Sequence, residues 1–175
     1  MKRPFTALTV LGTAAHHGFE LNAGVGLVFQ PWMGLGGSIA YWTANLPFLL
    51  WAAARGGDRF DRPLAFANGT ALAGAAVHFT IWPWEMRRGV PVLTEAEGLS
   101  AQQLPAYNTI LWTWALASAL ALARETPRGA RRWFVLGLLN GIPLRASARH
   151  HFTWASEQAR ANPAWWNRGL QPEAA

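Results

Sequence analysis

Residues 5–29 have the sequence FTALTVLGTAAHHGFELNAGVGLVF. This stretch is long and apolar enough to cross a hydrocarbon core about 30 Å thick, which requires roughly 20 helical residues. It also contains four strongly polar side chains, namely His16, His17, Glu20 and Asn22. The sequence therefore predicts a membrane-spanning helix that carries an ionisable group in its interior.

Three further stretches of similar length contain no Asp, Glu, Lys or Arg: residues 33–54, 63–84 and 105–123. A fifth candidate, residues 133–154, is apolar for only 12 residues before Arg145 and Arg149. It either crosses with its arginines extended to the interface or lies along the interface. We expect an all-α, polytopic membrane bundle of four to five transmembrane helices over residues 1–154. A polar C-terminal tail over residues 155–175 is expected to follow it.

The composition supports a membrane protein and excludes several kinds of site. Hydrophobic residues make up 51% of the 175 residues, and charged residues only 14%. Soluble domains usually contain about 25% charged residues. The chain has no cysteine, which excludes disulfide scaffolds, thiolate metal sites and cysteine nucleophiles.

Basic residues predict the orientation of the bundle. One side has only Arg87 and Arg88, whereas nine basic residues adjoin the other side: Lys2, Arg3, Arg55, Arg59, Arg62, Arg124, Arg128, Arg131 and Arg132. This excess of basic residues predicts a multi-pass protein of the cell membrane with its N-terminus in the cytoplasm. Because the basic residues lie beside the spans, membrane lipids are the expected partners and nucleic acid is not.

The strongest chemical signal is His16-His17-x-x-Glu20. A carboxylate inside hydrocarbon costs several kcal/mol unless it is paired or hydrated, so ionisable residues there usually have a function. His16 lies one helical turn before Glu20 on the same face, where it can share a proton with the carboxylate. We expect Glu20 and His16 to be catalytic, with His17 and His78 as further candidates.

Polar and aromatic residues in the other spans predict the lining of a substrate cavity. Each span has one polar edge, and these edges should converge inside the bundle. The expected lining residues are Tyr41, Trp42, Asn45, Asn68, Trp82, Trp112 and Asn140. Small residues such as Gly69 and Gly74 should let neighbouring helices approach closely.

The same histidines and Glu20 could also hold a metal ion. Nitrogen and oxygen ligands for zinc, non-haem iron or haem iron are available from His16, His17, Glu20, His78, His150 and His151. However, adjacent histidines on a helix point about 100° apart, and the HExxH pattern of zinc enzymes is absent. We therefore predict no cofactor, although a metal remains compatible with these residues.

These observations predict a small multi-pass membrane enzyme that performs acid–base chemistry in an intramembrane cavity. The expected substrate is a lipid or an isoprenoid-like apolar molecule, and the expected reaction is of the isomerase or cyclase type. One alternative is a non-enzymatic accessory subunit, docked on a partner membrane subunit, or a membrane protein that binds an apolar small-molecule ligand. A second alternative is a His/Glu metal-dependent membrane enzyme.

Overall fold

Prolines begin most of the long helices in the computed structural model, which describes residues 2–172. Proline lies in the first turn of α1 (Pro4–Ala23), α2 (Gln30–Arg55) and α4 (Leu104–Arg124). This position suits proline because the first helical N–H groups have no partner within the helix. The other long helices are α3 (Asp61–Ile81) and α6 (Gly141–Ala161), and the shorter α5 (Arg131–Leu139) precedes α6. The predicted all-α class is confirmed.

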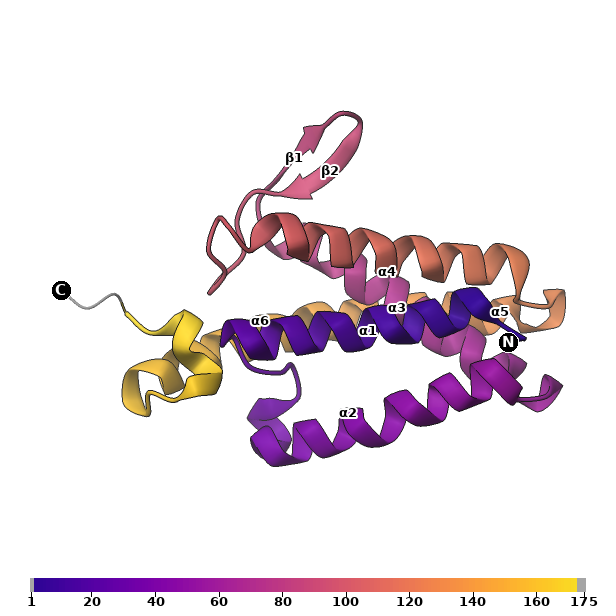
Figure 1. Cartoon of the computed structure of the whole chain (residues 1–175), viewed down its shortest axis with the longest axis horizontal. Helices are drawn as coiled ribbons and strands as arrows, with labels where there is room; N and C mark the ends of the chain where they lie inside the picture. Colours follow the sequence, from indigo (N-terminus) through magenta and orange to yellow (C-terminus); the bar gives the residue numbers. More distant parts are fainter. Residues whose placement is uncertain (1, 173–175) are drawn as a thin grey trace.

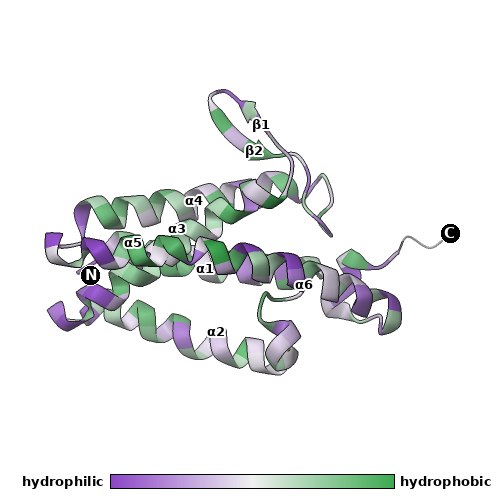
Figure 2. Cartoon of the chain, turned by 180° about the vertical axis from the view of Figure 1, so that it is seen from behind, coloured by the Kyte–Doolittle hydropathy of each residue, from purple (hydrophilic) through white to green (hydrophobic). Residues whose placement is uncertain are grey.

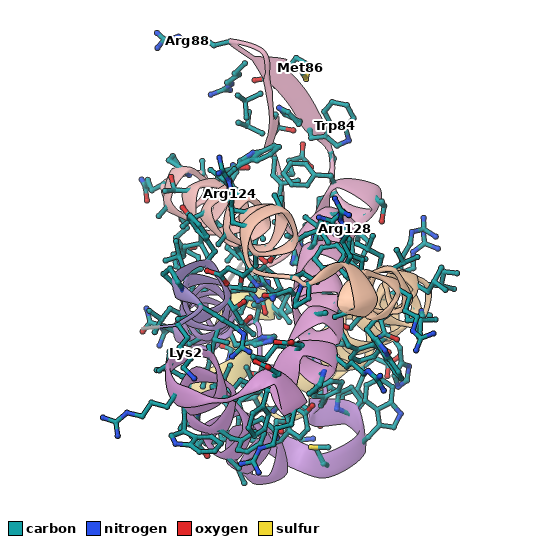
Figure 3. All side chains as sticks on the ribbon, turned by 90° about the vertical axis from the view of Figure 1, so that its right-hand side faces the viewer. Lys2, Trp84, Met86, Arg88, Arg124 and Arg128 are labelled. Carbon is teal, nitrogen blue, oxygen red and sulfur yellow. The ribbon has the colours of Figure 1, made fainter. Side chains whose placement is uncertain are left out.

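The long helices run back and forth between two ends of the molecule (Figure 1). The N-terminus, the end of α2 and the end of α4 lie at one end, which we call the basic end after Lys2, Arg55, Arg124 and Arg128. From there α5 and α6 return together along the bundle, with a break at Asn140. Figure 3 looks at the basic end, and Figure 2 shows strongly hydrophilic residues concentrated there and at the far end of α6.

The first helix is shorter than predicted. Gly24 adopts a left-handed conformation (φ 82°), and its N–H donates to the carbonyls of Glu20 and Leu21. Glycine tolerates this conformation, which commonly ends a helix. The chain therefore leaves the helix after Ala23 rather than at residue 29, and α2 already begins at Gln30. As a result, Glu20 lies in the last turn of α1.

The predicted loop between the third and fourth spans contains a β-hairpin that the sequence analysis missed. Strand β1 (Trp84–Arg87) pairs antiparallel with β2 (Val90–Leu93). Arg88 and Gly89 form the turn with positive φ angles, as two-residue hairpin turns require. The side-chain amide of Asn108 in α4 bonds both backbone groups of Leu93 and so anchors the hairpin. The rest of the hairpin projects away from the helices (Figures 1 and 3).

Two glycines allow α3 and α5 to touch through their backbones. A Cβ atom added to Gly69 would overlap the carbonyl oxygen of Phe134, and one added to Gly137 would overlap that of Phe66. The predicted close approach at Gly69 is therefore present. It holds α5, and with it the start of α6, against α3.

The end of the chain packs on the bundle. Residues 155–161 continue α6, and a short helix, η3 (Trp165–Leu170), lies against the end of α1. The Gly169 N–H donates to the Gly24 carbonyl at 3.0 Å, and Arg168 bonds the Asn22 carbonyl. The predicted tail is thus part of the folded structure as far as residue 172, and residues 173–175 lie outside the described residues.

The length and composition of the helices support only part of the predicted membrane topology. Among residues 2–172, two helical segments, Asp58–Ile81 and Leu104–Arg124, have the length and composition to cross a membrane. They coincide with the third and fourth predicted spans. The α1 and α2 helices are not among them, because polar side chains and glycines in both helices, and tryptophans in α2, lower the mean hydropathy.

Candidate functional site

His16 and Glu20 lie on the inner face of α1 and form the centre of the candidate site. The His16 Nε2 atom is 3.4 Å from Glu20 Oε1, and both side chains are buried. This one-turn pairing is the one that the sequence predicted. A buried carboxylate requires compensation by hydrogen bonds or positive charge, and the neighbouring helices bring further polar groups to it.

His78 comes from α3 and completes a group of three side chains. Its Nε2 atom lies 3.0 Å from His16 Nε2 and 3.8 Å from Glu20 Oε1. Its Nδ1 atom lies 2.8 Å from the carbonyl oxygen of Gly74, to which it donates. This bond fixes the proton of a neutral imidazole on Nδ1, so the lone pair of Nε2 points toward His16.

Tyr107 in α4 is the member of the site that the sequence analysis missed. Its hydroxyl donates to Glu20 Oε1 at 2.7 Å and lies 3.3 Å from His16 Nε2. The side chain is fully buried. The sequence contained an indication that Tyr107 faces inward, because Tyr107 lies seven residues before Trp114 and therefore on the same face of the helix. We call His16, Glu20, His78 and Tyr107 the polar cluster.

His17 lies beside the polar cluster. Its Nδ1 atom is 3.7 Å from Glu20 Oε2, and this nitrogen is buried without a hydrogen-bond partner. The ring packs against Trp42 of α2 in a tilted arrangement, with 4.0 Å between the ring centroids. All four predicted catalytic residues therefore meet in one place, although they come from two helices.

An apolar cavity begins at the polar cluster. It has a volume of about 280 Å³ and lies between α1, α2, α3 and α6, and most of its walls are aliphatic or aromatic. Thr6 and Glu20 both line it, so it extends along about 20 Å of α1. The polar groups of Glu20, His16 and His78 are gathered at one end of this length.

Three of the seven predicted lining residues face this cavity: Tyr41, Trp42 and Asn68. Leu46, Leu49 and Phe29, which were not predicted, also line it. The Asn68 amide donates to the Thr6 hydroxyl at 3.0 Å, and both residues line the cavity far from the polar cluster.

The other four predicted lining residues lie elsewhere. Asn45 donates to the Tyr41 carbonyl of its own helix, and Asn140 bonds the Thr70 hydroxyl at the break before α6. Trp112 lies on the outer face of α4 and bonds the Pro91 carbonyl of the hairpin. Trp82 packs on Phe152, beyond the end of α3. Their faces were misassigned because spacing along one helix does not show where its neighbours pack.

The remaining two histidines, His150 and His151, are neighbours on α6 but lie in different surroundings. His151 lines the cavity, and its Nε2 donates to the Val25 carbonyl at 2.9 Å. His150 is exposed and its ring packs against Trp32. Of the predicted metal-ligand candidates, His16, His17 and Glu20 place one donor atom each within 4.8 Å of one another, and His78 lies beside them. His150 is not part of this group.

Comparisons with known proteins do not assign the chain to a family. No protein-family model matches it, and no curated protein or solved structure matches it.

Proposed function

We propose that the protein is a multi-pass membrane enzyme that performs acid–base chemistry on an elongated apolar molecule held in the cavity. The substrate class that fits is a lipid or isoprenoid-like molecule, and the reaction class is isomerisation or cyclisation. Glu20 and His16 exchange protons with the reacting end of the substrate. His78 and Tyr107 hold these two groups in position.

The distribution of side chains supports a membrane location. Polar residues such as Glu20 and Asn108 are buried, whereas many large apolar side chains are exposed. Ile142 is 76% exposed, Leu116 59% and Val135 56%. In water such an apolar surface would be costly, but in a bilayer it faces lipid. The basic end then faces the cytoplasm, and the hairpin lies on the opposite side.

One observation carries the enzymatic part of the proposal: the apolar cavity ends at buried, convergent acid–base groups. An apolar pocket with a few polar groups at one end binds a ligand in a defined orientation. A carboxylate, two imidazoles and a phenol within hydrogen-bonding distance can donate and accept protons without contact with bulk water. A purely structural role does not require a cavity beside these groups.

A larger side chain in the cavity should prevent an apolar molecule from binding there. Ala148 lines the cavity from α6, whereas Ala146 lies on the outer face of the same helix. We expect apolar molecules extracted from the purified wild-type protein to include one that is retained at about one per chain. Mass spectrometry should show its loss in the Ala148→Phe variant and its retention in Ala146→Phe. Equal retention in both variants would show that the cavity is not the binding site.

A further inference from the structure

We propose that His16 Nε2, His78 Nε2 and Glu20 Oε1 together bind one divalent transition-metal ion. The inference rests on the proposed function, because the ion would meet the cavity ligand at its reacting end, and it changes one assignment. With the ion bound, His16 is a ligand and does not exchange protons, so proton exchange with the substrate falls to the second carboxylate oxygen of Glu20. The ligands come from α1 and α3, and all three side chains line the cavity.

The distances between the three donor atoms fit a common metal ion. His16 Nε2 lies 3.0 Å from His78 Nε2 and 3.4 Å from Glu20 Oε1, and the third side of the triangle is 3.8 Å. A point in the plane of these atoms is therefore about 2.0 Å from each of them. Zinc–nitrogen bonds are about 2.0–2.1 Å long and zinc–carboxylate bonds about 2.0–2.2 Å.

The chemical types of the three donor atoms indicate which metal ions would bind. Two imidazoles and one carboxylate suit zinc or ferrous iron, whereas magnesium and calcium prefer oxygen ligands alone. Three protein ligands with one open position are typical of catalytic rather than structural zinc sites. In such a site the ion would supply a Lewis acid for a polar group of the substrate.

Two of the three ligands are oriented as ligands in metal sites are. The bond from His78 Nδ1 to the Gly74 carbonyl leaves its Nε2 lone pair available, and Tyr107 donates to the ligating oxygen of Glu20. Such outer hydrogen bonds fix the tautomer of a ligating histidine and the position of a ligating carboxylate.

The charge of the site supplies an independent argument. Glu20 is buried, and the groups of the described residues that lie within ion-pair distance of it are histidines; no lysine or arginine is among them. Beside it, His17 Nδ1 is buried without a hydrogen-bond partner in a side chain that is only 10% exposed. A buried carboxylate without a fixed positive charge beside it is unfavourable. A divalent cation held by His16, His78 and Glu20 would supply this positive charge.

The metal content of the purified protein tests the inference. We expect the wild-type protein, prepared in mild detergent without chelators, to contain about one zinc or iron ion per chain by elemental analysis. His78→Ala should reduce this content at least tenfold. His150→Ala, at an exposed histidine outside the polar cluster, should retain it. Circular dichroism shows whether each variant keeps its helices.

Cobalt(II) provides a second measurement that does not depend on the metal acquired in the cell. After removal of the native ion, added Co²⁺ should give the visible absorption of a low-coordinate site in wild type and in His150→Ala, and not in His16→Ala. Equal metal content in wild type and His78→Ala, or no Co²⁺ spectrum in wild type, would overturn the metal site.

The metal site and the proposed function can fail separately. If the purified protein contains no metal, and the Ala148→Phe variant still lacks the cavity ligand, the metal site is overturned and the proposed function is not. The polar cluster would then be held by a His16–His78 hydrogen bond. A metal-loaded protein whose ligand content is the same in Ala148→Phe and Ala146→Phe supports the metal site and contradicts the proposed function.

Discussion

Replacement of Glu20 by glutamine should reduce proton exchange with the cavity ligand by about 10²- to 10⁴-fold, the usual contribution of a general acid or base. Glutamine keeps the size of the side chain and can still accept the hydrogen bond from Tyr107, so the fold should survive. The measurement does not require the reaction to be known. In heavy water, wild-type protein should introduce solvent deuterium at carbon atoms of the bound molecule, and mass spectrometry detects the mass increase.

An exposed carboxylate supplies the matched control for this experiment. Glu157 lies on the outer face of α6, away from the polar cluster, and Glu157→Gln should exchange deuterium at the wild-type rate. Deuterium exchange by Glu20→Gln at that same rate would contradict a catalytic role for Glu20. A retained ligand that never gains deuterium in wild-type protein would identify a binding protein rather than an enzyme.

Gly69→Leu is expected to have the largest effect on stability. Its side chain would have to occupy the space of the Phe134 backbone, since even a Cβ atom at Gly69 overlaps the Phe134 carbonyl oxygen. The α3 and α5 backbones must then separate, at a cost of at least about 3 kcal/mol. Thermal unfolding in detergent should show a much lower midpoint, or the protein should fail to accumulate.

A second glycine in a helix distinguishes this steric effect from helix propensity. Gly18 lies in α1 with no atom within 4 Å of an added Cβ. Gly18→Ala should leave stability unchanged or raise it by up to about 1 kcal/mol, because alanine is the better helix former. If Gly69→Leu and Gly18→Ala unfold at the same temperature, the close contact between α3 and α5 is not present in the protein.

The sequence was sufficient for features that depend on local periodicity. Long apolar runs located α3 and α4 to within three residues at each end, and the one-turn spacing of His16 and Glu20 placed both on one face. Helical geometry alone determines such features. The presence of His78 at the same site was also anticipated, because polar residues in apolar helices tend to face the bundle interior.

Features that depend on tertiary contacts were missed, and so was one local helix end. Apolar residues continue from Ala23 to Phe29, so hydropathy did not reveal that Gly24 ends α1. The hairpin depends on Asn108, which is distant from it in sequence, and Tyr107 joins the polar cluster only because α4 packs on α1. The three proposed metal ligands form no short motif, since His78 is 62 residues from His16.

Charged maleimide labelling of single cysteines tests most directly whether the helix that carries Glu20 lies within the membrane. The natural chain has no cysteine, so each introduced thiol reports on one position. In intact cells, Met86→Cys on the hairpin should react, and Gly129→Cys at the basic end should react only after permeabilisation. Ala15→Cys, exposed on α1 beside His16, should stay unreactive in both conditions because lipid covers it. Reaction of Ala15→Cys as fast as Met86→Cys would place this helix in water and contradict the account.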